Sequence, residues 1–225
     1  KKESFIKDLL KSPTLFFSCV GCSGFSGVFC YTFAVYIPTY LKQTFLLSKS
    51  MMMFTPILLT LSMVIGYLFF GPLSDKWGRV RTIKIGAVLT TLLSVPFIYI
   101  LNAGVFEIAL LSLVVIGFIS TIFIGPMNVL LAEAFNPMHR YRFAALSHAI
   151  GISLFGGTAP LVATSITQLT DGPFYLACYL LAAGLMGWGS IKLIQNHLSD
   201  SSYLKKGLVK DILVEKDYTE LPKAA

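Results

Sequence analysis

The stretch MMMFTPILLTLSMVIGYLFFGPLSDKWGRVRTIKIGAVLTTLLSVPFIYIL (residues 51–101) contains two long apolar runs separated by one short charged segment. A hydrocarbon core about 30 Å thick requires roughly 20 apolar residues in an α-helix. Residues 51–73 and 82–101 reach that length, and both runs are continuously apolar, whereas a membrane β-strand would alternate. The stretch therefore predicts two membrane-spanning helices joined by a charged loop.

Four further runs of the same kind occur along the chain, so we predict an all-α polytopic membrane protein with six transmembrane helices. The predicted spans are residues 14–41, 51–73, 82–101, 106–131, 141–168 and 173–194. They form one transmembrane domain at 14–195, between a cytoplasmic linker at 1–13 and a cytoplasmic tail at 196–225.

The composition supports burial in lipid. Of the 225 residues, 55% are hydrophobic and 13% are charged, about half the roughly 25% charged residues of soluble domains. The net charge of +7 does not indicate a nucleic-acid partner, because the cations flank apolar runs instead of forming the polar basic face that phosphate binding needs.

The cations also predict an orientation. Sixteen of the 18 lysines and arginines fall on one side of the six predicted spans, and the other side has Lys42 and Lys49 alone. Cytoplasmic loops of membrane proteins are enriched in these residues. Both ends of the segment are therefore expected in the cytoplasm, as an even number of spans requires.

No cofactor, metal or enzyme activity is predicted. Cys19 and Cys22 have C-x-x-C spacing, but they lie inside an apolar run without a second pair or a nearby histidine. The chain has no H-E-x-x-H or G-x-S-x-G motif, and Ser147 and His148, as neighbours in sequence, point to different faces of a helix.

The loop between the second and third predicted spans, GPLSDKWGRVR (residues 71–81), is the most specific local motif. Gly78 would permit a tight turn, and Asp75 near the start of the next helix is favoured by the helix dipole. The charges could latch a gate, or the loop could be a positively charged cytoplasmic loop without a gating role. The residues of this motif are Gly71, Asp75, Lys76, Gly78, Arg79 and Arg81.

This motif resembles the signature loop of the major facilitator superfamily. A second stretch, AEAFNPMHRY (residues 132–141) followed by FGGTAPL (residues 155–161), is similar to the metabolite:proton symporter branch, whose members carry proline and betaine, shikimate, 2-oxoglutarate or citrate. The cytoplasmic motif residues of the second stretch are Glu133, Arg140 and Tyr141.

The resemblance implies that the chain supplies spans seven to twelve of the fold and that the N-terminal six-helix half is missing. It implies a secondary active transporter of a bacterial inner membrane that imports a small polar metabolite, osmolyte or organic acid by proton symport with alternating access. Two alternatives stay open: another major facilitator carrier for sugars or drugs, or a stand-alone six-span carrier or channel that acts as a homodimer.

The resemblance also implies that the first and fourth spans line a central cavity. Phe29, Thr32 and Tyr36 fall on one face of the first span. They could form an aromatic substrate wall or a packing stripe between helices. In the fourth span Asn128 could contact the substrate or join two helices.

Two features of the predicted spans could serve the transport cycle. Pro126, and Gly156, Gly157 and Pro160 in the fifth span, could kink their helices and act as hinges. His148 is the strongly titratable side chain well inside the predicted membrane core, and could bind a proton or a substrate carboxylate. A neutral, hydrogen-bonded histidine between helices is the alternative.

Overall fold

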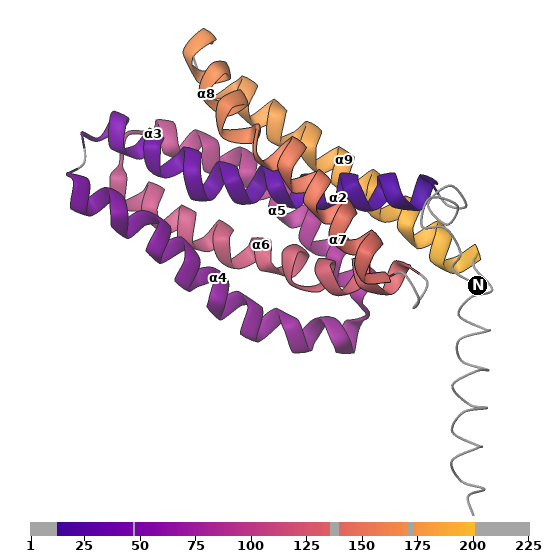
Figure 1. Cartoon of the computed structure of the whole chain (residues 1–225). Helices are drawn as coiled ribbons and strands as arrows, with labels where there is room; N and C mark the ends of the chain where they lie inside the picture. The colour runs from indigo at the N-terminus through magenta and orange to yellow at the C-terminus, as the bar shows by residue number, and fades with distance from the viewer. Residues whose placement is uncertain (1–12, 47, 136–139, 171–172, 201–225) are drawn as a thin grey trace, which may run out of the picture.

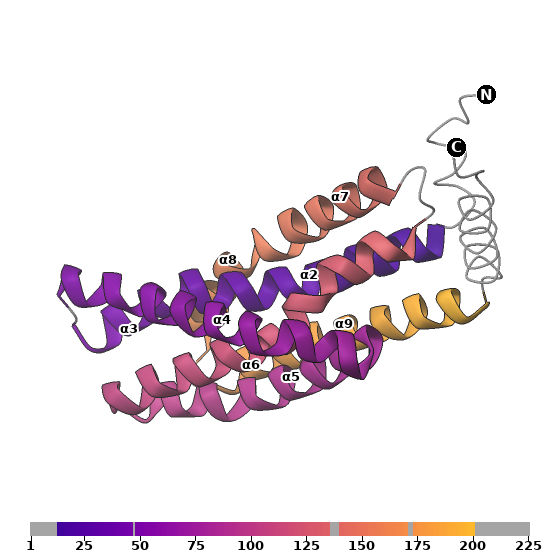
Figure 2. The same cartoon turned by 90° about the horizontal axis from the view of Figure 1, so that it is seen from below.

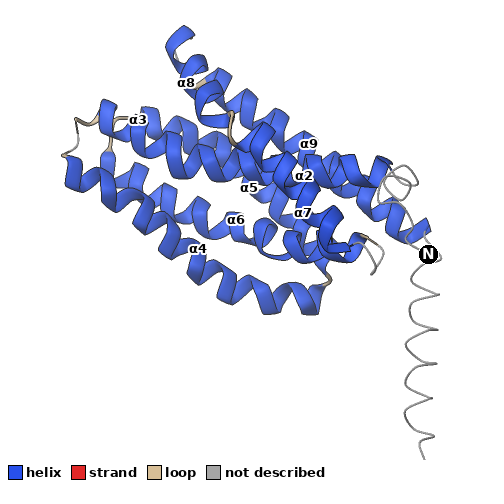
Figure 3. Cartoon of the chain, viewed as in Figure 1, coloured by secondary structure: helices blue, strands red, loops and turns tan. Residues whose placement is uncertain are grey.

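The computed structural model describes residues 13–46, 48–135, 140–170 and 173–200. Within these ranges every regular element is helical, and the helices are joined by short loops (Figure 3). Six helical segments are long and apolar enough to cross a membrane. The predicted all-α fold class with six spans is therefore confirmed.

Four spans are single helices and two are interrupted. The single helices are α4 (Lys49–Trp77), α5 (Arg79–Asn102), α6 (Phe106–Ala134) and α9 (Phe174–Asp200). The first span consists of α2 (Pro13–Tyr31), the π-helical segment η1 (Thr32–Tyr36) and α3 (Ile37–Thr44). The fifth consists of α7 (Arg140–Gly151), the π-helical segment η2 (Ile152–Gly156) and α8 (Ala159–Leu169).

The six spans alternate in direction, so each end of the bundle contains the ends of all six. We call one the Gly78 end, where α2, α5 and α7 begin and α9 finishes. The opposite one is the Asn102 end, where α3 and α8 finish and α9 begins. α9 continues to Asp200, beyond the predicted limit of the last span at residue 194.

The links between spans are short because glycine permits sharp reversals. Gly78, with a φ of 89°, is the single residue between α4 and α5. Gly104, with a φ of 79°, lies in the link from α5 to α6. Both values are in the left-handed region, which residues with a side chain rarely adopt. At the other end of α4, the Ser48 hydroxyl accepts a hydrogen bond from the Met51 N–H and caps the helix.

The first span is the centre of the bundle. α2 lies between α7 and α9 in two perpendicular views (Figures 1 and 2). In this span 72% of the apolar window is buried, against 22% in the second and fifth spans. The second and fifth spans are therefore much more open than the buried first span.

Glycines let the helices approach α2 closely. A methyl group added at Gly27 would lie 3.0 Å from the Cα atom of Gly156 in η2, and one added at Gly156 would lie 2.9 Å from the Cα atom of Gly27. Gly24 faces the Phe155 ring in the same way. Lipid tails are as apolar as the helix surfaces, so association in a membrane depends on such van der Waals contact between small residues.

A chain of aromatic rings fills the space that the glycines leave. Phe25 lies 4.7 Å from Phe29 and 4.5 Å from Phe123 of α6, measured between ring centroids. Phe29 lies 5.6 Å from Phe33, which lies 5.2 Å from Phe97 of α5. All five rings are buried, and most of the pairs have the edge-to-face geometry that aromatic side chains favour.

We expect Gly27→Ala to destabilise the bundle, because its methyl group would press on the backbone of η2. Overpacking of this kind costs about 1–3 kcal/mol, measurable as a lower free energy of unfolding in detergent micelles. Gly189→Ala is the matched control, since no atom lies within 4 Å of the added methyl group. Equal stabilities of the two variants would contradict the proposed contact.

Candidate functional site

The Gly78 end carries a cluster of three charged side chains from three helices. Arg79, the first residue of α5, lies 3.3 Å from Asp75 near the end of α4, measured from Nη2 to Oδ1. The Nη1 atom of Arg79 also donates a hydrogen bond to Glu133 of α6. The structure therefore joins the two sequence motifs that were predicted separately, through one guanidinium group.

The ion pairs of this cluster contribute little to stability. The side chains of Arg79, Asp75 and Glu133 are 31%, 65% and 50% exposed. Ion pairs exposed to this degree contribute about 0–1 kcal/mol each, because solvent screens them and ordering long side chains costs entropy. Such contacts can break and re-form without unfolding the helices that they join.

The other residues of the two motifs lie outside the cluster. Lys76, Arg81 and Tyr141 are exposed, and Gly71 has open space around its Cα atom. Arg140 starts α7, and its Nε atom is buried without a hydrogen-bond partner in the described part of the chain.

The predicted substrate-cavity residues divide into two groups. Phe29, Thr32 and Tyr36 are buried among the helices of this bundle, and Phe29 belongs to the chain of aromatic rings. Asn128 is exposed on α6. In the first span the ring of Tyr31 is 37% exposed.

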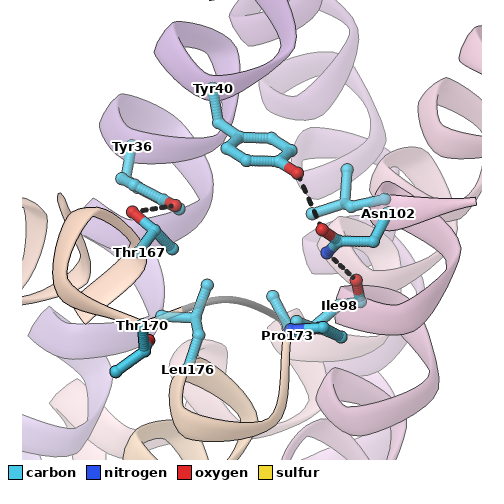
Figure 4. Close-up of a pocket in the computed structure, with 9 residues that line it drawn as sticks. Tyr36, Tyr40, Ile98, Asn102, Thr167, Thr170, Pro173 and Leu176 are labelled. Atoms are coloured by element: carbon cyan, nitrogen blue, oxygen red, sulfur yellow. Dashed lines mark hydrogen bonds between the residues drawn. The ribbon is translucent and has the colours of Figure 1, made fainter. Parts of the chain in front are cut away.

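A pocket of about 100 Å³ lies at the Asn102 end, between the first span, α5, α8 and α9 (Figure 4). The Tyr36 hydroxyl donates a hydrogen bond of 3.1 Å to Thr167 Oγ1, and the Tyr40 hydroxyl donates one of 3.0 Å to Asn102 Oδ1. The Asn102 amide in turn donates to the Ile98 carbonyl at 2.9 Å. Neutral hydrogen bonds thus tie the first span to the fifth and third spans.

Sequence reasoning missed the roles of Asn102 and Thr167 in this pocket. Asn102 falls between two predicted spans, at 82–101 and 106–131, and Thr167 falls inside the predicted fifth span, so neither was singled out. A usable signal did exist, since Tyr36, Tyr40, Asn102 and Thr167 all occur near span ends that alternate topology brings to one side.

His148 lies on α7 at the interface with α2. Its Nδ1 atom is 3.3 Å from the hydroxyl of Ser23, which is fully buried. The histidine itself is half-buried and about 12 Å along the helix from Arg140, at 1.5 Å per residue. Ser23 was not predicted as its partner, because no local pattern links residues 125 positions apart.

The predicted hinge residues also divide into two groups. Gly156 ends η2 and Gly157 lies in the turn after it, whereas Pro160 is near the start of α8. The fifth span is therefore interrupted at the predicted position. α6 continues through Pro126 as one helix. The hinge role of all four residues stays a prediction.

The sequence of the chain matches a known protein family. The family model described as Major Facilitator Superfamily matches residues 7–203. The chain belongs to the Major Facilitator Superfamily. It is thus a multi-pass membrane protein of a family of transporters rather than enzymes.

Curated members of the superfamily that resemble the chain are named as transporters of proline, betaine or related solutes. It is 33% identical over 215 residues, 93% of the chain and 45% of the relative, to the "Putative proline/betaine transporter" of Staphylococcus aureus (strain COL). It is 30% identical over 174 residues, 75% of the chain and 34% of the relative, to a glycine betaine/proline/ectoine/pipecolic acid transporter of Dickeya dadantii (strain 3937). It is 28% identical over 191 residues, 83% of the chain and 37% of the relative, to the proline/betaine transporter of Escherichia coli (strain K12).

These relatives are consistent with the metabolite:proton symporter branch of the superfamily that the motifs resemble. The chain spans about half the length of the curated relatives that it matches. No solved structure matches the chain. Within the described residues, no group of three or more His, Cys, Asp and Glu side chains could hold a metal ion.

We expect Arg79→Gln and Glu133→Gln to show a small coupling energy in a double-mutant cycle on the free energy of unfolding. The coupling should be about 0.2–1 kcal/mol at low salt and should shrink at high ionic strength. Lys76→Gln combined with Glu133→Gln is the control cycle, with no coupling expected because Lys76 lies outside the cluster. A coupling that is zero at low salt, or that does not shrink as salt is added, would contradict the expected electrostatic coupling between Arg79 and Glu133.

Proposed function

We propose that the chain is the C-terminal half of a secondary transporter that imports a small zwitterionic osmolyte of the proline or betaine kind. The transport is by proton symport with alternating access. The observation that carries the proposal is the family match over residues 7–203, on a chain that spans about half the length of its relatives. The names of those relatives supply the substrate class.

The open face of the fifth span supports a partner half. Ser153, Ser165 and Gln168 are exposed on η2 and α8, although polar side chains inside a membrane are costly where they face lipid. A face that mixes these with Leu154 and Leu161, 60% and 70% exposed, suits contact with protein or a water-filled cavity. We assign this face and the open face of α4 to the N-terminal six-helix half.

The charged cluster of Asp75, Arg79 and Glu133 is proposed as the latch of the gate. Its ion pairs are individually weak, so they can close the Gly78 end and release it during the cycle. We place this end in the cytoplasm, because the adjoining loops and flanks have an excess of lysine and arginine. The membrane is then the bacterial inner (plasma) membrane, since the relatives are bacterial.

The substrate and proton sites are proposed at residues that the bundle leaves accessible. Asn128 is exposed and His148 half-buried, so both can be reached without unpacking the core. Phe29, Thr32 and Tyr36 are buried, so a substrate would reach them only after η1 moves. In the described residues the acidic side chains lie near helix ends, and the main proton-coupling carboxylate is therefore assigned to the missing half.

Uptake into proteoliposomes by the full-length protein tests the function. We expect betaine or proline to accumulate when the outside is more acidic than the interior, and the accumulation to collapse when a protonophore removes the gradient. Shikimate and dicarboxylates are the comparison substrates, and protein-free liposomes the blank. Uptake of neither betaine nor proline, or uptake indifferent to the proton gradient, would refute the proposal.

His148→Gln should abolish or strongly alter the pH dependence of that uptake, because glutamine preserves a hydrogen bond to Ser23 but cannot bind a proton at physiological pH. His197→Gln is the matched control, since His197 lies in the last turn of α9. An unchanged rate and pH profile in the His148 variant would remove this residue from the mechanism.

A further inference from the structure

An open groove of about 680 Å³ runs between the start of α5 and the end of α9, at the Gly78 end. Its lining combines cations from α5 with an amide from α9 and the apolar side chains of Val80 and Ile85. The groove is separate from the pocket at the Asn102 end, and none of the predicted cavity residues lines it.

The groove has more positive charge than the structure neutralises. Arg79 is paired with two carboxylates. Lys84 donates a hydrogen bond to the neutral amide of Gln195, and exposed Arg81 has no acidic partner within the described residues. Lys192 lies one turn before Gln195 on α9. Its Nζ atom is 5.4 Å from the centroid of the Trp188 ring. Three cations around one groove thus lack a counter-charge from the described chain.

From these cations toward the middle of the bundle, α5 and α9 present exposed apolar side chains on the same side. On α5, Ile85, Val88 and Leu92 are 37%, 42% and 59% exposed, at spacings of three and four residues that define one helical face. On α9, Leu185 and Trp188 are 71% and 42% exposed, on the same face as Lys192. The surface is therefore basic at the bundle end and apolar toward the middle of the membrane.

We propose that this groove is a binding site for an anionic phospholipid. Arg81, Lys84 and Lys192 would hold the phosphate and the acidic headgroup, and the apolar faces of α5 and α9 would carry the acyl chains. Trp188 lies beneath Lys192, at the boundary between headgroups and hydrocarbon, which is the depth that aromatic rings favour. A free phosphate ion would use the cations but not the apolar faces, so the arrangement favours a lipid.

The test uses the full-length protein in neutral phosphatidylcholine–detergent micelles. Phosphatidylglycerol is titrated while thermal stability and the retained lipid, counted by native mass spectrometry, are recorded. The protein should retain phosphatidylglycerol and unfold at a higher temperature as it binds. Each cation near the membrane surface contributes about a fivefold factor in affinity, so Lys84→Gln/Lys192→Gln should weaken binding at least about tenfold.

Lys42→Gln/Lys49→Gln is the matched control, because it removes the same number of charges from the Asn102 end and should bind as the unmodified protein does. Inorganic phosphate is titrated in parallel to separate the two sources of the same chemistry. The proposal is overturned if the Lys84/Lys192 variant keeps its affinity, if the control variant loses as much, or if inorganic phosphate stabilises the protein as well as phosphatidylglycerol does.

Discussion

Close contact between the backbones of α2 and its neighbours is the interaction on which the rest of the structure depends. Lipid gives helices no hydrophobic reason to associate, so the bundle is held where glycine removes the side chain between two helices. Gly27 and Gly156 meet directly, and this contact joins the first span to the π-helical segment of the fifth. With α2 enclosed, the second and fifth spans are left with open faces.

The two ends of the bundle are joined by different chemistry. At the Gly78 end, ion pairs between exposed side chains connect α4, α5 and α6, and salt weakens them. At the Asn102 end, Tyr36–Thr167 and Tyr40–Asn102 hydrogen bonds connect the first span to α8 and α5, and neutral bonds are less sensitive to salt. Both interrupted spans place their π-helical segments between these ends, and π-helical segments are frequent at functional sites.

Much of the fold could be predicted, because its signals are local. The length of the apolar runs predicted six spans, and the glycine and proline of residues 156–160 predicted the interruption after η2. The candidate functional site was harder to predict from the sequence than the fold. Phe29, Thr32 and Tyr36 were predicted to share one face of the first span, but periodicity cannot say whether such a stripe faces a cavity or the neighbouring helix. In the structure that face is buried, and η1 at Thr32–Tyr36 had no signal in the sequence.

The sequence by itself determined the number of spans, the charge difference between their two sides and the superfamily, since each follows from the order of residues along one segment. Only the tertiary structure decided which distant residues meet: Arg79 with Glu133, Ser23 with His148, and Lys84 with Gln195. The physical reason is that a helix offers neighbours on every side. Which face meets which partner depends on how closely small residues let two helices approach, and that is a property of the pair of helices rather than of either one.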